Sequence, residues 1–136
     1  MLLKMFFTIA GHKGAPSDVS ILLGRTPTKI HRKHPVLKDR QDFPEWEWTI
    51  EETRNGDVDV DDSVNTFIGS TVEPISRFGP KISEAGWSAS LLCYIEPASL
   101  GAGLYLSKES VATLAKLSMD FGIDSQSSAD GGNAPV

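Results

Sequence analysis

The sequence contains a single cysteine, Cys93, among its 136 residues. One cysteine excludes an internal disulfide, and its position on an apolar strand face favours a reducing compartment. Long hydrophobic runs are also missing, because the N-terminal MLLKMFF is interrupted by Lys4 and is too short for a signal peptide or a spanning helix. The sequence therefore predicts a cytoplasmic protein without a membrane role.

Basic residues are fewer than acidic ones, 13 against 18, and the formal net charge is −5. Nucleic-acid binding needs a concentration of Lys and Arg to neutralise phosphates, so this balance argues against nucleic acid as a partner. With 40% hydrophobic residues, a chain of this length can bury a core of its own as one domain.

Motifs for catalysis and cofactor binding are likewise missing. His31 and His34 lie near acidic residues, but the adjacent Pro35 and the basic neighbours disfavour a metal site. Cys93 lies between apolar residues, unlike the electropositive, open setting of a catalytic thiolate. The run DVDVDD resembles the start of a calcium loop, yet Asp62 replaces the required glycine, which leaves at most weak divalent binding. We expect no catalytic residue, no metal and no cofactor.

The clearest structural signal begins at Trp87, where residues alternate in hydrophobicity up to Glu96 as they do in a strand. Pro97 ends this strand, and residues 104–106 predict a second short strand, antiparallel to the first. Ser107 is then expected to cap a helix. The apolar spacing of that helix comprises Val111, Leu114, Ala115 and Ser118.

Similar patterns place the remaining elements. Strands are predicted at residues 3–10, 29–33, 45–51 and 121–123. A helix capped by Ser17 should end at Gly24, and two further helical pieces should meet at Pro74, covering residues 62–73 and 74–85. The buried face of these pieces should comprise Val64, Phe67, Ile68, Thr71, Val72 and Ile75.

These elements predict an α+β fold: an antiparallel or mixed sheet of about six strands, with three helices mainly on one face. The first strand should be central or nearly so. Residues 1–124 should form the domain, since residues 125–136 have the composition of a disordered tail.

Trp46 and Trp48 point to the same side of the predicted strand. They are interpreted either as core residues beneath a helix or as a stacking platform for a base, a sugar or a partner side chain. Both interpretations remain open at this stage.

The charge is divided into blocks along the chain. Six basic residues within 25–40 face a single acid, and nine acids within 42–62 face a single arginine. Such blocks either solvate a surface or form a binding face. The candidate residues for binding are Arg32, Lys33, Arg40, Asp57, Asp59 and Asp62.

The segments FFTIAG, PSDVSILLGRTPTKIHRK, SASLLCYIE and GLYLSKESVATLAKLSMDFGIDS, together with the tryptophan strand, resemble a bacterial family known as domain of unknown function 4279. The most specific pieces are LLGRTPTK and the pairing of a CYIE strand with a GLYLS helix segment. His31 stands where that family often has an aromatic residue. The resemblance implies a small bacterial α+β domain, similarity to immunity-type proteins of toxin systems, and no known catalytic residue.

The leading hypothesis is a cytosolic, non-enzymatic protein-binding module, an immunity-like partner of a bacterial toxin or effector. The alternative is a small-ligand-binding domain that uses a groove lined by Trp46 or Trp48, and a third hypothesis is an uncharacterised enzyme. A neighbouring toxin gene would favour the first hypothesis, and a metabolic gene cluster the second.

Overall fold

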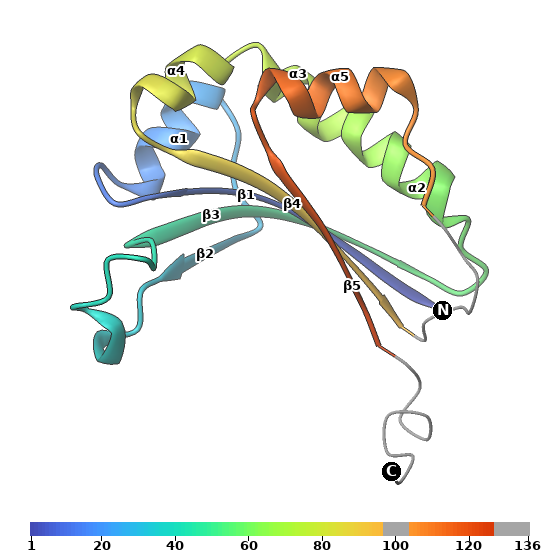
Figure 1. Cartoon of the computed structure of the whole chain (residues 1–136), viewed down its shortest axis with the longest axis horizontal. Coiled ribbons are helices and arrows are strands. Elements are labelled where there is room, and N and C mark those ends of the chain that lie inside the picture. Colours follow the sequence, from blue (N-terminus) through green and yellow to red (C-terminus); the bar gives the residue numbers. More distant parts are fainter. Residues whose placement is uncertain (97–103, 127–136) are drawn as a thin grey trace, which may run out of the picture.

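The computed structural model describes residues 1–96 and 104–126. Its five strands form one sheet in the order β2-β3-β1-β4-β5, with β1 at the centre (Figure 1). Only β5 runs parallel to its neighbour, so the sheet is mixed and the α+β prediction is confirmed. The strands are β1 (Leu2–Gly11), β2 (Lys29–Arg32), β3 (Trp46–Asn55), β4 (Ser88–Glu96) and β5 (Asp120–Ser125).

The alternation in β1 sets the two faces of the sheet. Leu3, Met5, Phe7 and Ile9 have no exposed surface, whereas the even-numbered residues between them are half-buried. Because successive side chains of a strand point to opposite faces, the odd-numbered residues contact the helices and the even-numbered ones lie on the face without helices. We call this second surface the open face.

Helices cover one face of the sheet, as predicted (Figure 1). All six residues of the expected helical face, from Val64 to Ile75, are buried, and all except Thr71 belong to the hydrophobic core. The helical elements are α1 (Pro16–Leu23), a short 3-10 turn at Pro35–Leu37, α2 (Val60–Phe67), the π-helical turn η2 (Ile68–Val72), α3 (Glu73–Ser76), α4 (Gly79–Glu84) and α5 (Lys108–Lys116).

A new helical piece begins beside Pro74 as expected, because α3 starts at Glu73, but the backbone does not leave the helical conformation there. The chain stays helical through η2, where the Glu73 amide donates to the Ile68 carbonyl five residues earlier. A proline lacks the amide that an α-helix needs at this point, and the wider π turn accommodates it. The break follows later, at Arg77 and Phe78, before α4.

Three local expectations also need correction or refinement. The first helix is capped at Ala15 rather than Ser17, and its amide donates to the Asp18 carboxylate at 2.9 Å, while Gly24 ends the helix in the left-handed conformation as expected. Ser107 caps α5 as predicted, by accepting from the Ser110 amide. The buried side of α5 is rotated, because Val111, Ala115 and Ser118 are exposed while Ser110, Thr113, Leu114 and Leu117 are buried.

Residues 104–106 do not form the predicted strand. The Tyr105 amide donates to Asp61 Oδ1 at 2.9 Å, and its carbonyl accepts from Asn65 Nδ2 at 2.8 Å. Side chains of α2 thus satisfy the backbone groups that a neighbouring strand would have paired. The remaining strand is β5, which includes Ser125, the first residue of the predicted tail 125–136. Residues 127–136 of that tail lie outside the described residues.

Candidate functional site

Both candidate tryptophans of β3 lie in the core. Trp48 has no exposed surface, and its indole Nε1 donates to Ser20 Oγ at 3.0 Å. Trp46 is 2% exposed and packs edge-to-face against Trp87, with ring centroids 5.5 Å apart. Burial of an aromatic side chain with its polar atom bonded is the usual core arrangement, and Trp48 follows it.

Trp46 also borders a pocket of about 310 Å³. Its own Nε1 is buried and has no hydrogen-bond partner among the described residues. The pocket lies between β2, the start of β3 and the connection between them. Its wall comprises His31, Arg32, Lys33, His34, Leu37, Phe43, Pro44, Trp46 and Glu47.

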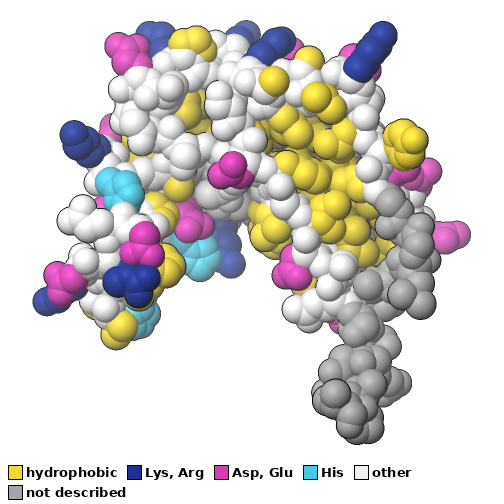
Figure 2. Space-filling model, in the orientation of Figure 1, with side chains coloured by type: hydrophobic (Ala, Val, Ile, Leu, Met, Phe, Trp, Pro, Cys, Tyr) yellow, Lys and Arg dark blue, Asp and Glu magenta, His cyan; other side chains and the backbone are white. Residues whose placement is uncertain are grey.

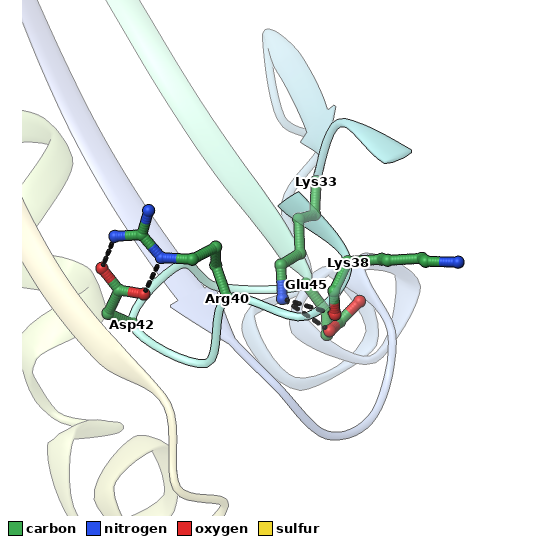
Figure 3. Close-up of polar contacts among 5 residues, drawn as sticks. All are labelled: Lys33, Lys38, Arg40, Asp42 and Glu45. Atoms are coloured by element: carbon green, nitrogen blue, oxygen red, sulfur yellow. Dashed lines mark hydrogen bonds and ion pairs between the residues drawn. The ribbon is translucent and has the colours of Figure 1, made fainter. Parts of the chain in front are cut away.

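Two cations of the basic segment beside this pocket form ion pairs with nearby acids (Figure 3). The Lys33 side chain is 5% exposed and bonds Glu45 Oε1 at 3.2 Å. Arg40 forms a two-pronged pair with Asp42, at 3.0 and 2.8 Å, and this guanidinium lowers the pKa of the Asp42 carboxyl. Arg32, like Lys29 and Lys38, is exposed and forms no ion pair with any described residue, and it is the one of the three that lines this pocket.

The acidic segment contributes to local structure at the start of α2. Asp59 accepts a hydrogen bond from the Asp62 amide at 3.0 Å, as an N-terminal helix cap does. Asp57 and Asp62 are exposed and have no such role among the described contacts. This segment follows the last residue of β3, whereas Arg32 pairs with the first. Ten strand residues span about 30 Å, so Asp57 and Asp62 do not share a surface with Arg32, whereas Asp42 and Glu45 at the start of the acidic block pair with the basic block.

The open face holds a hollow that sequence reasoning missed. Phe6 of β1 pairs with Leu92 of β4, and both side chains lie on this face. Near them, Thr8 and Thr49 share a hydrogen bond of 2.9 Å between their hydroxyls. The hollow has a volume of about 340 Å³ and is lined by Phe6, Thr8, Ala10, Lys29, His31, Glu47, Thr49, Ser90 and Leu92.

One signal in the sequence could have revealed this hollow. Phe6 and Leu92 are large apolar residues at positions where the alternation of each strand calls for polar ones. Leu92 is 42% exposed in the structure. An apolar pair on the polar face of two neighbouring strands indicates a surface that contacts something else.

The rim of the open face is acidic. By strand register this face carries Lys4 and Lys29 and five acids, which gives a formal charge of −3 from two positive and five negative groups. The Tyr94 hydroxyl donates to Glu96 at 2.5 Å, and this bond, together with the nearby charges of Glu96 and Asp124, raises the pKa of the Tyr94 phenol. The acids are Glu47, Glu51, Glu96, Asp120 and Asp124.

Cys93 is fully buried on the helix-facing side of β4, as the strand pattern predicted. Burial raises the pKa of its thiol to about 11, so the thiol stays protonated at neutral pH. Across residues 1–96 and 104–126, no cluster of three or more His, Cys, Asp or Glu side chains is arranged to hold a metal ion.

In the same two ranges, no helix combines the length and the apolar character needed to cross a bilayer. No curated protein and no solved structure matched the chain. A family model does match it, over residues 1–128, and that range includes every described element of the sheet and the helical layer. The chain therefore belongs to the family described as Domain of unknown function (DUF4279).

Proposed function

We propose that the protein is a cytosolic, non-enzymatic protein-binding module that receives its partner on the open face of its sheet. The observation that carries the proposal is the apolar pair that lines the open-face hollow, the half-buried Phe6 and the 42% exposed Leu92. Helices cover the opposite face, so this surface is the broad one left for contact (Figure 1). An apolar centre surrounded by a charged rim is the common anatomy of a protein interface.

The charge of the rim supports a cationic partner. Five acids against two lysines leave the open face net negative, in line with the whole chain. Complementary fields speed association and reject partners of the wrong sign. A bacterial toxin or effector with a basic surface has this chemistry, and an immunity-like role is the specific form of the proposal.

The chemistry of the hollow favours binding over catalysis. Its two threonine hydroxyls bond to each other, so neither is activated by a base among the described residues. The buried Cys93 thiol faces the opposite side of the sheet. A threonine pair held in this way fits a fixed polar contact of a binding surface.

The test is affinity capture from the native host with the wild-type protein and two variants. Leu92→Asp places a charge at the centre of the open face, and Val111→Asp places the same charge on the exposed side of α5, where the side chain is 52% exposed. A partner captured by the wild type and by Val111→Asp, but not by Leu92→Asp, supports the proposal. Equal capture by all three proteins contradicts it, provided that circular dichroism shows both variants folded.

A small-ligand function is the second candidate, favoured by the unpaired Trp46 Nε1 and the pocket that this ring borders. Apolar walls from Leu37 and Phe43 beside the unpaired Arg32 suit a hydrophobic carboxylate. A thermal-shift screen of aromatic carboxylates tests it: a hit should raise the melting temperature of the wild type and not of Arg32→Gln. Stabilisation of both proteins to the same extent would place the ligand elsewhere.

A further inference from the structure

β5 forms one edge of the sheet and leaves a row of backbone groups without a partner in the described part of the chain. The Gln126 amide donates to the Ile95 carbonyl of β4 at 3.0 Å. Because the backbone groups of successive strand residues point to opposite sides, those of Phe121, Ile123 and Ser125 point away from β4. Such an edge is a template for another strand.

Side chains of two kinds flank this edge. Asp120 and Asp124 are exposed and lie on the open face, in register with Ser90 and Tyr94. Phe121 is half-buried and Ile123 is 47% exposed, and both lie on the helix-facing side. Figure 2 shows hydrophobic side chains gathered in the area between α5 and β5. One side of the edge is therefore anionic and the other apolar.

We propose that β5 binds an extended segment of a partner protein, which adds a strand to the sheet and alternates basic with aliphatic residues. The basic side chains lie opposite Asp120 and Asp124, and the aliphatic ones cover Phe121 and Ile123. Backbone hydrogen bonds supply attraction and the alternating side chains supply specificity, as in other cases of strand addition. The inference rests on the proposed function as a protein-binding module and specifies how the partner binds.

Charge decides between this partner and a second copy of the chain. If two β5 strands paired antiparallel about Gly122, each Asp120 would lie opposite the Asp124 of the other copy. Like charges in directly opposed positions destabilise a strand pair, whereas opposite charges stabilise it. The other sheet edge is protected differently: β2 has four residues, all exposed, and includes Lys29 and Arg32.

Amide hydrogen exchange measured by NMR tests the proposal residue by residue. The probe is a short peptide in which lysine and valine alternate, and the matched control replaces each lysine with glutamate. In the free protein, the amides of Phe121, Ile123 and Ser125 should exchange fast while those of Gly122 and Asp124 are protected by β4. The lysine peptide should slow the three outward amides by about tenfold or more, in proportion to its occupancy, and the glutamate peptide should not.

Variants separate the backbone contribution from the charge contribution. Asp120→Asn with Asp124→Asn should weaken binding of the lysine peptide by about threefold to tenfold, because each cross-strand charge pair contributes modestly. Asp57→Asn with Asp62→Asn removes the same charge elsewhere and should leave the affinity within about twofold, since screening acts over roughly 8 Å. Ile123→Pro removes an outward amide and should abolish binding, whereas Ile123→Thr keeps that amide. If the proline variant fails to fold, the two asparagine pairs decide the matter.

Three results would overturn the inference. Outward amides that are already protected in the free protein would mean that the edge is occupied, by residues 127–136 or by a second copy, and a deletion of those residues and a dilution series tell which. Equal protection by both peptides would refute the charge argument. Capture of a partner that depends on Leu92, with unchanged exchange at β5, would keep the proposed function and refute strand addition.

Discussion

Gly11 permits two tryptophan rings to meet at the end of β1. A Cβ atom at this position would lie 2.7 Å from Trp46 Cζ2 and 2.7 Å from Trp87 Cδ1. Real Cβ atoms essentially never approach other heavy atoms so closely, so at least one ring would have to move. Trp46 is 2% exposed and Trp87 is half-buried, so a movement of either ring would disturb the edge-to-face contact between them.

We predict that Gly11→Ala lowers the free energy of unfolding by about 1 to 2 kcal/mol. Overpacking of a core costs roughly 1 to 3 kcal/mol, and the reduced freedom of the unfolded alanine chain offsets about 0.4 to 1 kcal/mol of that. For a domain of this size, the melting temperature should fall by about 3 to 8 °C. The assay is urea unfolding followed by tryptophan fluorescence, together with a thermal melt.

Gly69→Ala is the matched control, because no atom lies within 4 Å of its added Cβ and the residue is helical. This variant should be as stable as the wild type, or more stable by up to about 1 kcal/mol, from helix propensity. A smaller ring, Trp87→Leu, should reduce the penalty of Gly11→Ala in a double-mutant cycle. Unchanged stability of Gly11→Ala, or equal penalties with and without the Trp87 ring, would refute the packing argument.

Further predictions concern the polar contacts and the charges. Asn65→Ala removes four hydrogen bonds, three of which hold residues 105–110 against α2, so it should lower stability by about 2 to 3 kcal/mol in urea unfolding; a loss below half a kcal/mol would contradict this. Cys93→Ala should lower stability by about 1 kcal/mol, and the native thiol should react slowly with a thiol reagent, because burial raises its pKa to about 11; rapid labelling would contradict burial. Glu96→Gln should move the pKa of Tyr94 back toward its ordinary value in a spectrophotometric titration, since the bond to the carboxylate raises it and favours the neutral phenol up to the raised pKa; an unchanged titration would refute this cause. For any captured partner that uses the charge blocks, the association rate should fall with salt and respond to Arg32→Gln or Asp57→Asn; a flat salt response would exclude both blocks.

The choice of these last two variants follows from the structure. Lys33 is 5% exposed and paired with Glu45, so its replacement would disturb the connection between β2 and β3 as well as the surface charge. Asp59 caps α2, and its replacement would weaken that helix. Arg32 and Asp57 are exposed without such roles among the described contacts, and a change in binding rate can therefore be assigned to their charge.

The hydrophobic periodicity of the sequence is sufficient to predict the central strands and helices of the fold. β1 and β4 have ten and nine residues in which apolar and polar positions alternate, and the apolar residues of α2 through α3 recur at helical spacing. Many apolar positions therefore indicate the same buried face. Short segments carry less information. Leu104 to Leu106 have a strand-like composition, but their backbone groups bond to Asp61 and Asn65, which lie about 40 residues earlier in the chain. No local pattern predicts such a contact.

The open-face hollow depends on register rather than on composition. On the open face Phe6 lies between Lys4 and Thr8, and Leu92 follows Ser90, so the two side chains become a patch only because β1 and β4 pair with these residues opposite each other. The positions of the charges relative to one another also depend on strand register. Arg32 and Asp57 are 25 positions apart in the sequence and fall at opposite ends of β3, whereas Glu96 and Asp124 meet beside Tyr94 across a parallel pair.

The apolar pair and the acidic residues that strand register brings together lie on the same face of the sheet. The apolar pair lies between β1 and β4, and the acids that share the open face are densest where β4 meets β5. A partner strand on β5 would place its basic side chains on the open face. The same face holds the hollow, whose lining includes Ser90 and Leu92 of the neighbouring strand β4. A partner that added such a strand and inserted an apolar side chain near Leu92 would therefore use both features at once. The Leu92→Asp variant and the pair Asp120→Asn with Asp124→Asn should then weaken the same interaction, and their effects should not be additive if one bound segment joins them.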